Sequence, residues 1–286
     1  MPDAPSFERL LKRDRAITIA GLLTLCALAW LHVLTGAGLG MSAREMTTLS
    51  LFPHQAAAVQ ASVQSMPGMD MAPAAATSAW SPETSALMVA MWWVMMVAMM
   101  SPSAAPTILL YARVHRHAIA QGQVEKRLAP TGAFAAGYLL AWLGFSIAAT
   151  ALHWALERAG LVSEMLMGSQ SRWLSGGVLI AAGLYQLSPL KQTCLAHCRA
   201  PAVFLSTHWR PHASGALRLG VTHGAYCVGC CWMLMALLFV GGVMNLAWIA
   251  ALAVLVLAEK LFPAGRWIGI ACGAALVGWG VATLLV

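Results

Sequence analysis

Four side chains that can bind a soft metal ion lie within nine residues of one apolar segment: His223, Cys227, Cys230 and Cys231. On an α-helix, the first three fall within a sector of about 60°, with Cys231 beside it. Residues three or four apart can share one ion, but His223 and Cys230 would lie about 10 Å apart along the axis. The segment therefore predicts two ligands per ion, with further ligands from elsewhere. Packing is the alternative, since free cysteine is common in buried positions.

A second group of soft ligands lies in the segment 191–199, where Cys194 and Cys198 are four residues apart and His197 is adjacent. A helical turn would place both thiols on one side. The group belongs to a basic segment that we place on the cytoplasmic side. We therefore predict a second metal-binding cluster there, although the spacing is weaker than that of paired zinc-binding motifs.

Methionines dominate the apolar segment that ends at Pro102. At helical spacing they form one stripe, in which core packing is the alternative to ion binding. We expect Pro102 and Pro106 to interrupt this helix and free backbone carbonyls. The stripe predicts a path for a soft ion. Its members are Met88, Met91, Met95, Met96, Met99 and Met100, of which the last four are candidate ligands.

A third methionine group, Met66, Met69 and Met71, lies in the polar segment 41–84, which we expect outside the cytoplasm. Thioethers bind Cu(I) or Ag(I) without losing a proton. The alternative is a linker that merely contains methionine.

Composition identifies a membrane protein. Of 286 residues, 60% are hydrophobic and 9% are charged, whereas soluble domains carry roughly 25% charged residues. The expected fold is an all-α bundle, in which most spans approach the ~20 residues that a bilayer requires. The seven predicted spans are 16–39, 85–110, 131–156, 172–187, 216–242, 245–261 and 265–286.

Basic residues predict the orientation. With the N-terminus inside and the C-terminus outside, 14 of the 17 Lys and Arg lie in the cytoplasmic segments, if the link around Lys260 and the boundary residues Arg218 and Arg266 are included; Arg44, Arg158 and Arg172 lie elsewhere. This positive-inside pattern explains the net charge of +7 and argues against nucleic acid as a partner. We expect a multi-pass protein of the bacterial inner membrane. Its parts are a tail with a first anchor helix (1–40), an outer loop (41–84) and a metal-binding bundle (85–286).

Several motifs together resemble an uncharacterised family of bacterial integral membrane proteins described as predicted metal-binding. They are the Met-Trp-Trp…Ala-Met-Met-Ser-Pro run at 91–102, the segment 188–199, the run from His223 to Met233, and Glu259-Lys260. The resemblance covers about residues 85–262. It implies a metal and names no reaction.

The leading hypothesis is transport or delivery of a soft metal, Cu(I) first and zinc as an alternative, rather than enzymatic catalysis. A periplasmic or cytoplasmic metallochaperone would be the exchange partner. We predict a primary site that joins Cys227, with Cys230 or Cys231, to a methionine from 95–100, with Met99 and Cys230 meeting near mid-depth. Thioethers outside and thiols inside suit a descending path for Cu(I).

Two other functions fit parts of the pattern. Cys227 and Cys230 have CxxC spacing, and Cys194 with Cys198 could be their inner partners in a transmembrane thiol relay. Haem could bind to histidines near different spans, namely His32, His153 and His223, as bundle haem sites often require.

Overall fold

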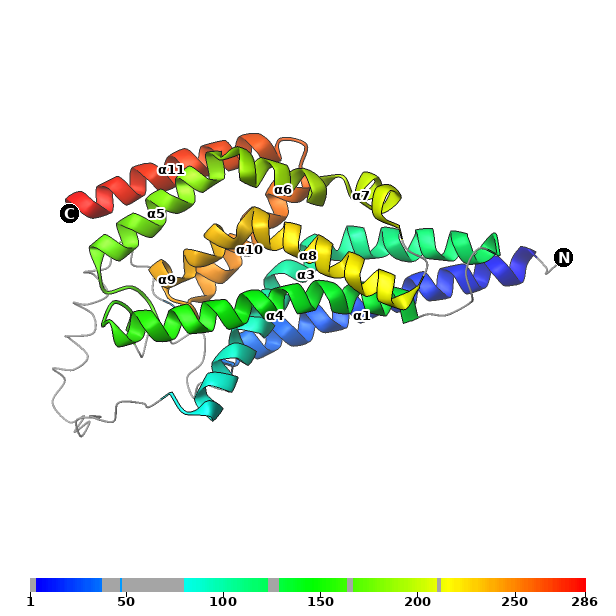
Figure 1. The fold of residues 1–286 in the computed structure, drawn as a ribbon, viewed down its shortest axis with the longest axis horizontal. Helices are drawn as coiled ribbons and strands as arrows, with labels where there is room; N and C mark the ends of the chain where they lie inside the picture. The colour runs from blue at the N-terminus through cyan, green and yellow to red at the C-terminus, as the bar shows by residue number, and fades with distance from the viewer. Residues whose placement is uncertain (1–3, 38–46, 48–79, 123–128, 164–166, 210–211) are drawn as a thin grey trace.

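A computed structural model describes the chain apart from residues 1–3, 38–46, 48–79, 123–128, 164–166 and 210–211 (Figure 1). The described residues form helices with short connections and one isolated antiparallel bridge, between Val162 and Ser169. The all-α prediction is confirmed for this part of the chain. The helices are α1 (Ala4–Leu34), α3 (Pro82–Ala120), α4 (Ala129–Arg158), α5 (Arg172–Leu187), α6 (Pro189–Arg199), α7 (Pro201–His208), α8 (Ala213–Ala236), α9 (Leu238–Gly241), α10 (Leu246–Leu261) and α11 (Gly265–Leu285).

Helices occupy all seven positions where spans were predicted, and five segments are long and apolar enough to cross a membrane: Arg15–Leu34, Pro82–Ala120, Pro130–Arg158, Ala213–Gly241 and Gly265–Leu285. The other two, α5 and α10, have 16 residues each. At ~1.5 Å per residue they are about 24 Å long, which is short of a hydrocarbon core of about 30 Å. Seven crossings and their orientation therefore stay predictions.

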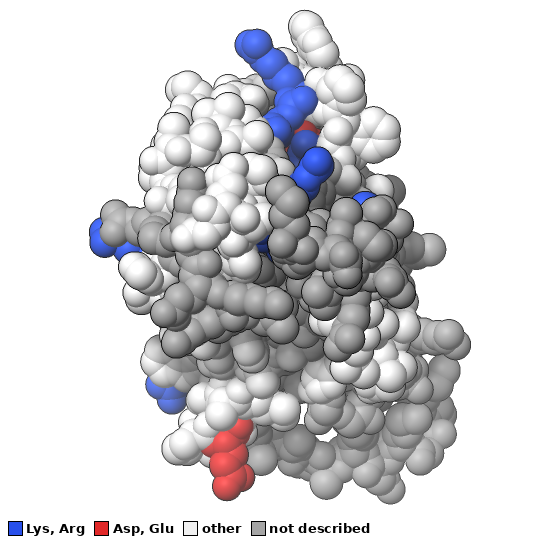
Figure 2. Space-filling view, turned by 90° about the vertical axis from the view of Figure 1, so that its right-hand side faces the viewer, with Lys and Arg blue, Asp and Glu red and all other residues white. Residues whose placement is uncertain are grey.

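The start of α1 and the end of α11 lie at opposite ends of the long axis (Figure 1). An odd number of crossings would give this arrangement. Figure 2 looks onto the end near the start of α1 and shows Lys and Arg at several points among uncharged residues.

A polar side chain fixes where α6 begins. Ser188 ends α5 and caps α6, because its side-chain oxygen accepts a hydrogen bond from the Lys191 backbone N–H at 3.2 Å. Pro189 occupies the first turn, where its missing N–H costs nothing. The chain thus changes direction between α5 and α6, and α6 packs along α8.

The two prolines of α3 do not interrupt it, contrary to the sequence-based expectation. Both lie inside a continuous helix of 39 residues. At Pro102, a neighbouring side chain approaches the carbonyl that has lost its backbone donor: the Cys26 thiol lies 4.0 Å from the Ala98 carbonyl oxygen, four residues before the proline. The helix bends instead of ending, since in Figure 1 its first half rises steeply and its second half runs more nearly horizontal.

Glycines allow α4 and α8 to pack with their backbones in close contact. A Cβ atom at Gly220 would lie 2.0 Å from the Phe134 carbonyl oxygen, and one at Gly224 would lie 2.5 Å from the Ala141 Cβ. Small residues at a helix crossing commonly serve this purpose in membranes. Here they bring Tyr138 of α4 against Cys227 of α8.

We expect Gly220→Ala to destabilise the fold by about 1–3 kcal/mol, because the added methyl group meets backbone that cannot move aside. Thermal unfolding in detergent measures the effect. Gly278→Ala is the matched control, since a Cβ at that helical position has no neighbour within 4 Å. Equal unfolding temperatures for the two variants would contradict the prediction.

Candidate metal centre

The site is built around Cys227, which lies on α8 and is 1% exposed. Its Sγ lies 2.9 Å from Lys260 Nζ of α10 and 3.1 Å from the Tyr138 hydroxyl of α4. The same ammonium group donates to Ser103 Oγ of α3 at 3.1 Å, and the Tyr138 hydroxyl donates to the Met100 carbonyl oxygen at 3.3 Å. Four helices therefore converge on one thiol.

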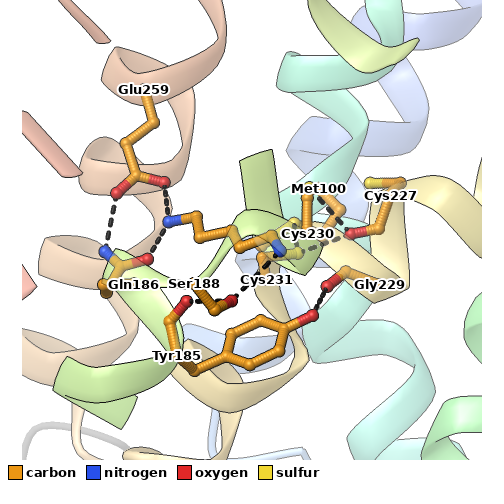
Figure 3. Close-up of polar contacts among 10 residues, drawn as sticks. Met100, Tyr185, Gln186, Ser188, Cys227, Gly229, Cys230, Cys231 and Glu259 are labelled. Atoms are coloured by element: carbon orange, nitrogen blue, oxygen red, sulfur yellow. Dashed lines mark hydrogen bonds and ion pairs between the residues drawn. The ribbon is translucent and has the colours of Figure 1, made fainter. Parts of the chain in front are cut away.

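Two more thiols of α8 lie one turn further along. Cys230 and Cys231 both donate to the Cys227 carbonyl oxygen, at 3.0 and 2.9 Å. Figure 3 shows these residues beside Met100, whose Sδ lies 4.0 Å from Cys231 Sγ. The sequence predicted that Met99 would meet Cys230, and the observed sulfur contact is one residue further along each helix. A methionine of α3 and a cysteine of α8 therefore do lie together.

The cysteines of α6, predicted from the sequence as a second cluster on the cytoplasmic side, lie next to the thiols of α8. The Cys198 thiol interacts with the thiols of Cys227 and Cys230. Cys194 lies against the backbone of α8, since a Cβ at Gly229 would be 2.9 Å from its Sγ. The physical reason is the Ser188-Pro189 break, which turns α6 along α8. We call these residues the thiol cluster: Cys194, Cys198, Cys227, Cys230 and Cys231.

Of the other predicted ligands, the methionines of α3 and His223 are buried in the bundle, and the methionines of the outer loop are not described by the structure. The methionines of the α3 stripe are all buried, at most 9% exposed. His223 is also buried, and its ring lies between 5.4 and 6.0 Å from those of Phe134, Tyr138 and Phe204. Met66, Met69 and Met71 lie outside the described residues.

The alternatives stay predictions. All seven cysteines are free thiols, and those of the proposed relay are neighbours. Of the candidate haem ligands, His32 is exposed on α1, whereas His153 and His223 are buried on α4 and α8.

A buried ion pair holds α6 next to the cluster. Lys191 of α6 is 0% exposed, and its Nζ lies 2.6 Å from Glu259 Oε2 of α10. Gln186 of α5 donates to the other oxygen of Glu259 at 2.7 Å and accepts from Lys191 (Figure 3). Every charged group of this network therefore has a partner.

Lys260 is a residue of this candidate site that sequence reasoning did not include. It follows Glu259 directly, and a rotation of about 100° per residue points the two side chains in different directions. Glu259 pairs with Lys191, whereas the Lys260 ammonium group contacts the Cys227 thiol and the Ser103 hydroxyl within the described part of the chain. A buried charge is stable only when it is paired. Lys260 therefore places a positive charge where a thiolate, or a thiolate–metal complex, would carry a negative one.

The donor set suits a soft ion of low coordination number. Within the described part of the chain, no three His, Cys, Asp or Glu side chains are arranged to hold one ion. A closed tetrahedral zinc site needs four such ligands. Two thiols with a thioether beside them are soft donors of a kind that Cu(I) accepts.

The fold and these donors define a class: a helical protein with membrane-length apolar segments that gathers sulfur ligands around one buried lysine. A family model described as "PpoB2: Copper chaperone" matches residues 89–283, and the chain belongs to this copper chaperone family. The matched range contains the thiol cluster, Lys260 and all but the first methionine of the stripe. No curated protein and no solved structure matched the chain.

Proposed function

We propose that this chain is a copper chaperone of the inner membrane that binds Cu(I) in the thiol cluster and passes it to or from the methionine stripe of α3. The single observation that carries the proposal is the meeting of Cys227, Cys198 and Cys230 thiols next to the Lys260 ammonium group. Two thiolates and one Cu(I) carry a net charge of −1, which Lys260 neutralises. The complex would then be buried without an unpaired charge.

The methionine stripe supports movement of the ion as well as its storage. The contact between Met100 and Cys231 joins thioethers to thiols. Thioethers bind Cu(I) without deprotonation, whereas thiolates bind it as charged ligands and hold it more tightly. An ion entering along the stripe would therefore settle in the cluster. A metallochaperone is the expected exchange partner, and the direction of exchange is left open by the ligands.

The proposal is tested by Cu(I) titration of the full chain, purified in detergent under reducing conditions, in competition with a chromogenic Cu(I) chelator. We expect tight binding, with sulfur as the main scatterer in copper X-ray absorption. Protein that takes up no Cu(I) would overturn the proposal.

Cys198→Ser is expected to weaken Cu(I) binding about tenfold or more, a loss of ~1.4 kcal/mol, because it removes a thiol that reaches Cys227 from another helix. Chelator competition gives the affinity. Cys272→Ser is the control, because Cys272 is a partly buried thiol of α11 outside the cluster. An equal loss in both variants would mean that the effect is structural.

A further inference from the structure

We infer that the chain has a second site for a soft monovalent cation, centred on His153 of α4 and placed at the start of the methionine stripe. This inference extends the proposed function, since it gives the stripe a ligand at the end away from the thiol cluster. His153 does not contribute to that cluster.

His153 is buried without the partners that a buried imidazole normally has. The residue is 0% exposed, and neither ring nitrogen has a hydrogen-bond partner among the residues that the structure describes. The nearest charged group is Glu157, whose Oε2 lies 4.0 Å from Nε2. The other carboxylate oxygen accepts a hydrogen bond from Trp80 Nε1 at 3.1 Å. Buried polar groups nearly always have a hydrogen-bond partner. The lone pair of an imidazole nitrogen at this position is therefore available to bind a cation.

Aromatic rings enclose the imidazole. The ring centroids of Trp80, Trp92 and Phe239 lie 6.0, 6.5 and 5.7 Å from that of His153, each in an edge-to-face arrangement. Such walls exclude water, and aromatic rings attract cations. The Glu157 carboxylate supplies the negative charge that would balance a monovalent cation. The surroundings of His153 are therefore suited to a cation, and within the described ranges no side chain donates a hydrogen bond to the imidazole.

The stripe supplies soft ligands next to this position. Met88, Met95 and Met96 are three or four residues from Trp92 and so lie on the same face of α3. They are between 0% and 9% exposed. An imidazole nitrogen and a thioether are both ligands that Cu(I) and Ag(I) accept. Trp92 and Met100 are eight residues apart, about 12 Å at ~1.5 Å per residue, and Met100 contacts the thiol cluster. The stripe thus connects two sites of different ligand type.

The test uses Ag(I) as the probe and the full chain with Cys227→Ser and Cys230→Ser, which removes the main thiols. We expect this double variant to retain Ag(I), with a nitrogen scatterer of imidazole type in silver X-ray absorption. Adding His153→Phe should remove the nitrogen signal and weaken Ag(I) binding at least tenfold. His117→Phe in the same background is the control, because His117 is an exposed histidine of α3.

An unchanged nitrogen signal after His153→Phe would overturn the inference. His153→Gln serves if the phenylalanine variant does not fold, because it keeps a polar side chain and removes the imidazole. Methionines of the 41–84 segment could also retain silver, but they give sulfur scattering alone. Failure of the thiol cluster is recognised separately. If the thiol cluster binds no metal, wild type and the Cys227→Ser, Cys230→Ser variant should bind Ag(I) equally. Loss of the nitrogen signal with His153→Phe would still support the site at His153.

Discussion

Cys227→Ser is expected to weaken Cu(I) binding by a factor of about 100 or more, corresponding to ~2.7 kcal/mol. The Cys227 thiol is the group on which Lys260, Tyr138 and Cys198 converge. A serine hydroxyl has nearly the same shape, so the fold should persist, but it is a hard ligand and stays protonated. Chelator competition measures the affinity, and the far-ultraviolet spectrum checks the helices.

Cys26→Ser is the control for that experiment, because Cys26 is a thiol of α1 that faces the Ala98 carbonyl of α3 at 4.0 Å. It should bind Cu(I) as wild type does. Wild-type affinity in Cys227→Ser would place the ion elsewhere and leave the thiol cluster as packing.

Lys191→Met is expected to destabilise the protein by about 3–5 kcal/mol, because it leaves the buried Glu259 carboxylate without its cation. The two side chains are 0% and 2% exposed and lie 2.6 Å apart. Thermal unfolding in detergent measures the loss. The variant should also bind Cu(I) more weakly, since the ion pair holds α6, and with it Cys198, near α8.

The double variant Lys191→Met, Glu259→Gln distinguishes a broken ion pair from lost packing. Removing both charges should restore much of the stability, which makes the two substitutions strongly non-additive. If the double variant is as unstable as the sum of the single ones, the ion pair contributes little and the effect comes from packing.

The sequence predicted the helix positions well, because membrane-length apolar runs and a capping residue such as Ser188 are local signals. It also grouped Cys227, Cys230 and Cys231, since residues three or four apart share a face of one helix. It could not place Cys198 beside them. That contact depends on how α6 packs against α8, which is a property of tertiary packing.

Two local preferences are overridden for the same reason. A proline is read as a helix end, yet α3 continues through Pro102, where the Cys26 thiol of α1 approaches the freed Ala98 carbonyl. A lysine at a helix end is expected to extend towards water, yet Lys260 is 7% exposed. In both cases the local preference is opposed by partners from distant segments, which no single stretch of sequence displays.

The position of Lys260 has a consequence for which metals the chain can carry. Two thiolates beside one ammonium group leave a deficit of one positive charge. A monovalent ion cancels it, whereas zinc would leave a surplus positive charge in a buried site. Zinc also binds thiolates well, so softness alone would not exclude it. The lysine would therefore make the cluster discriminate by valence, which protects a copper carrier from the commoner divalent competitor.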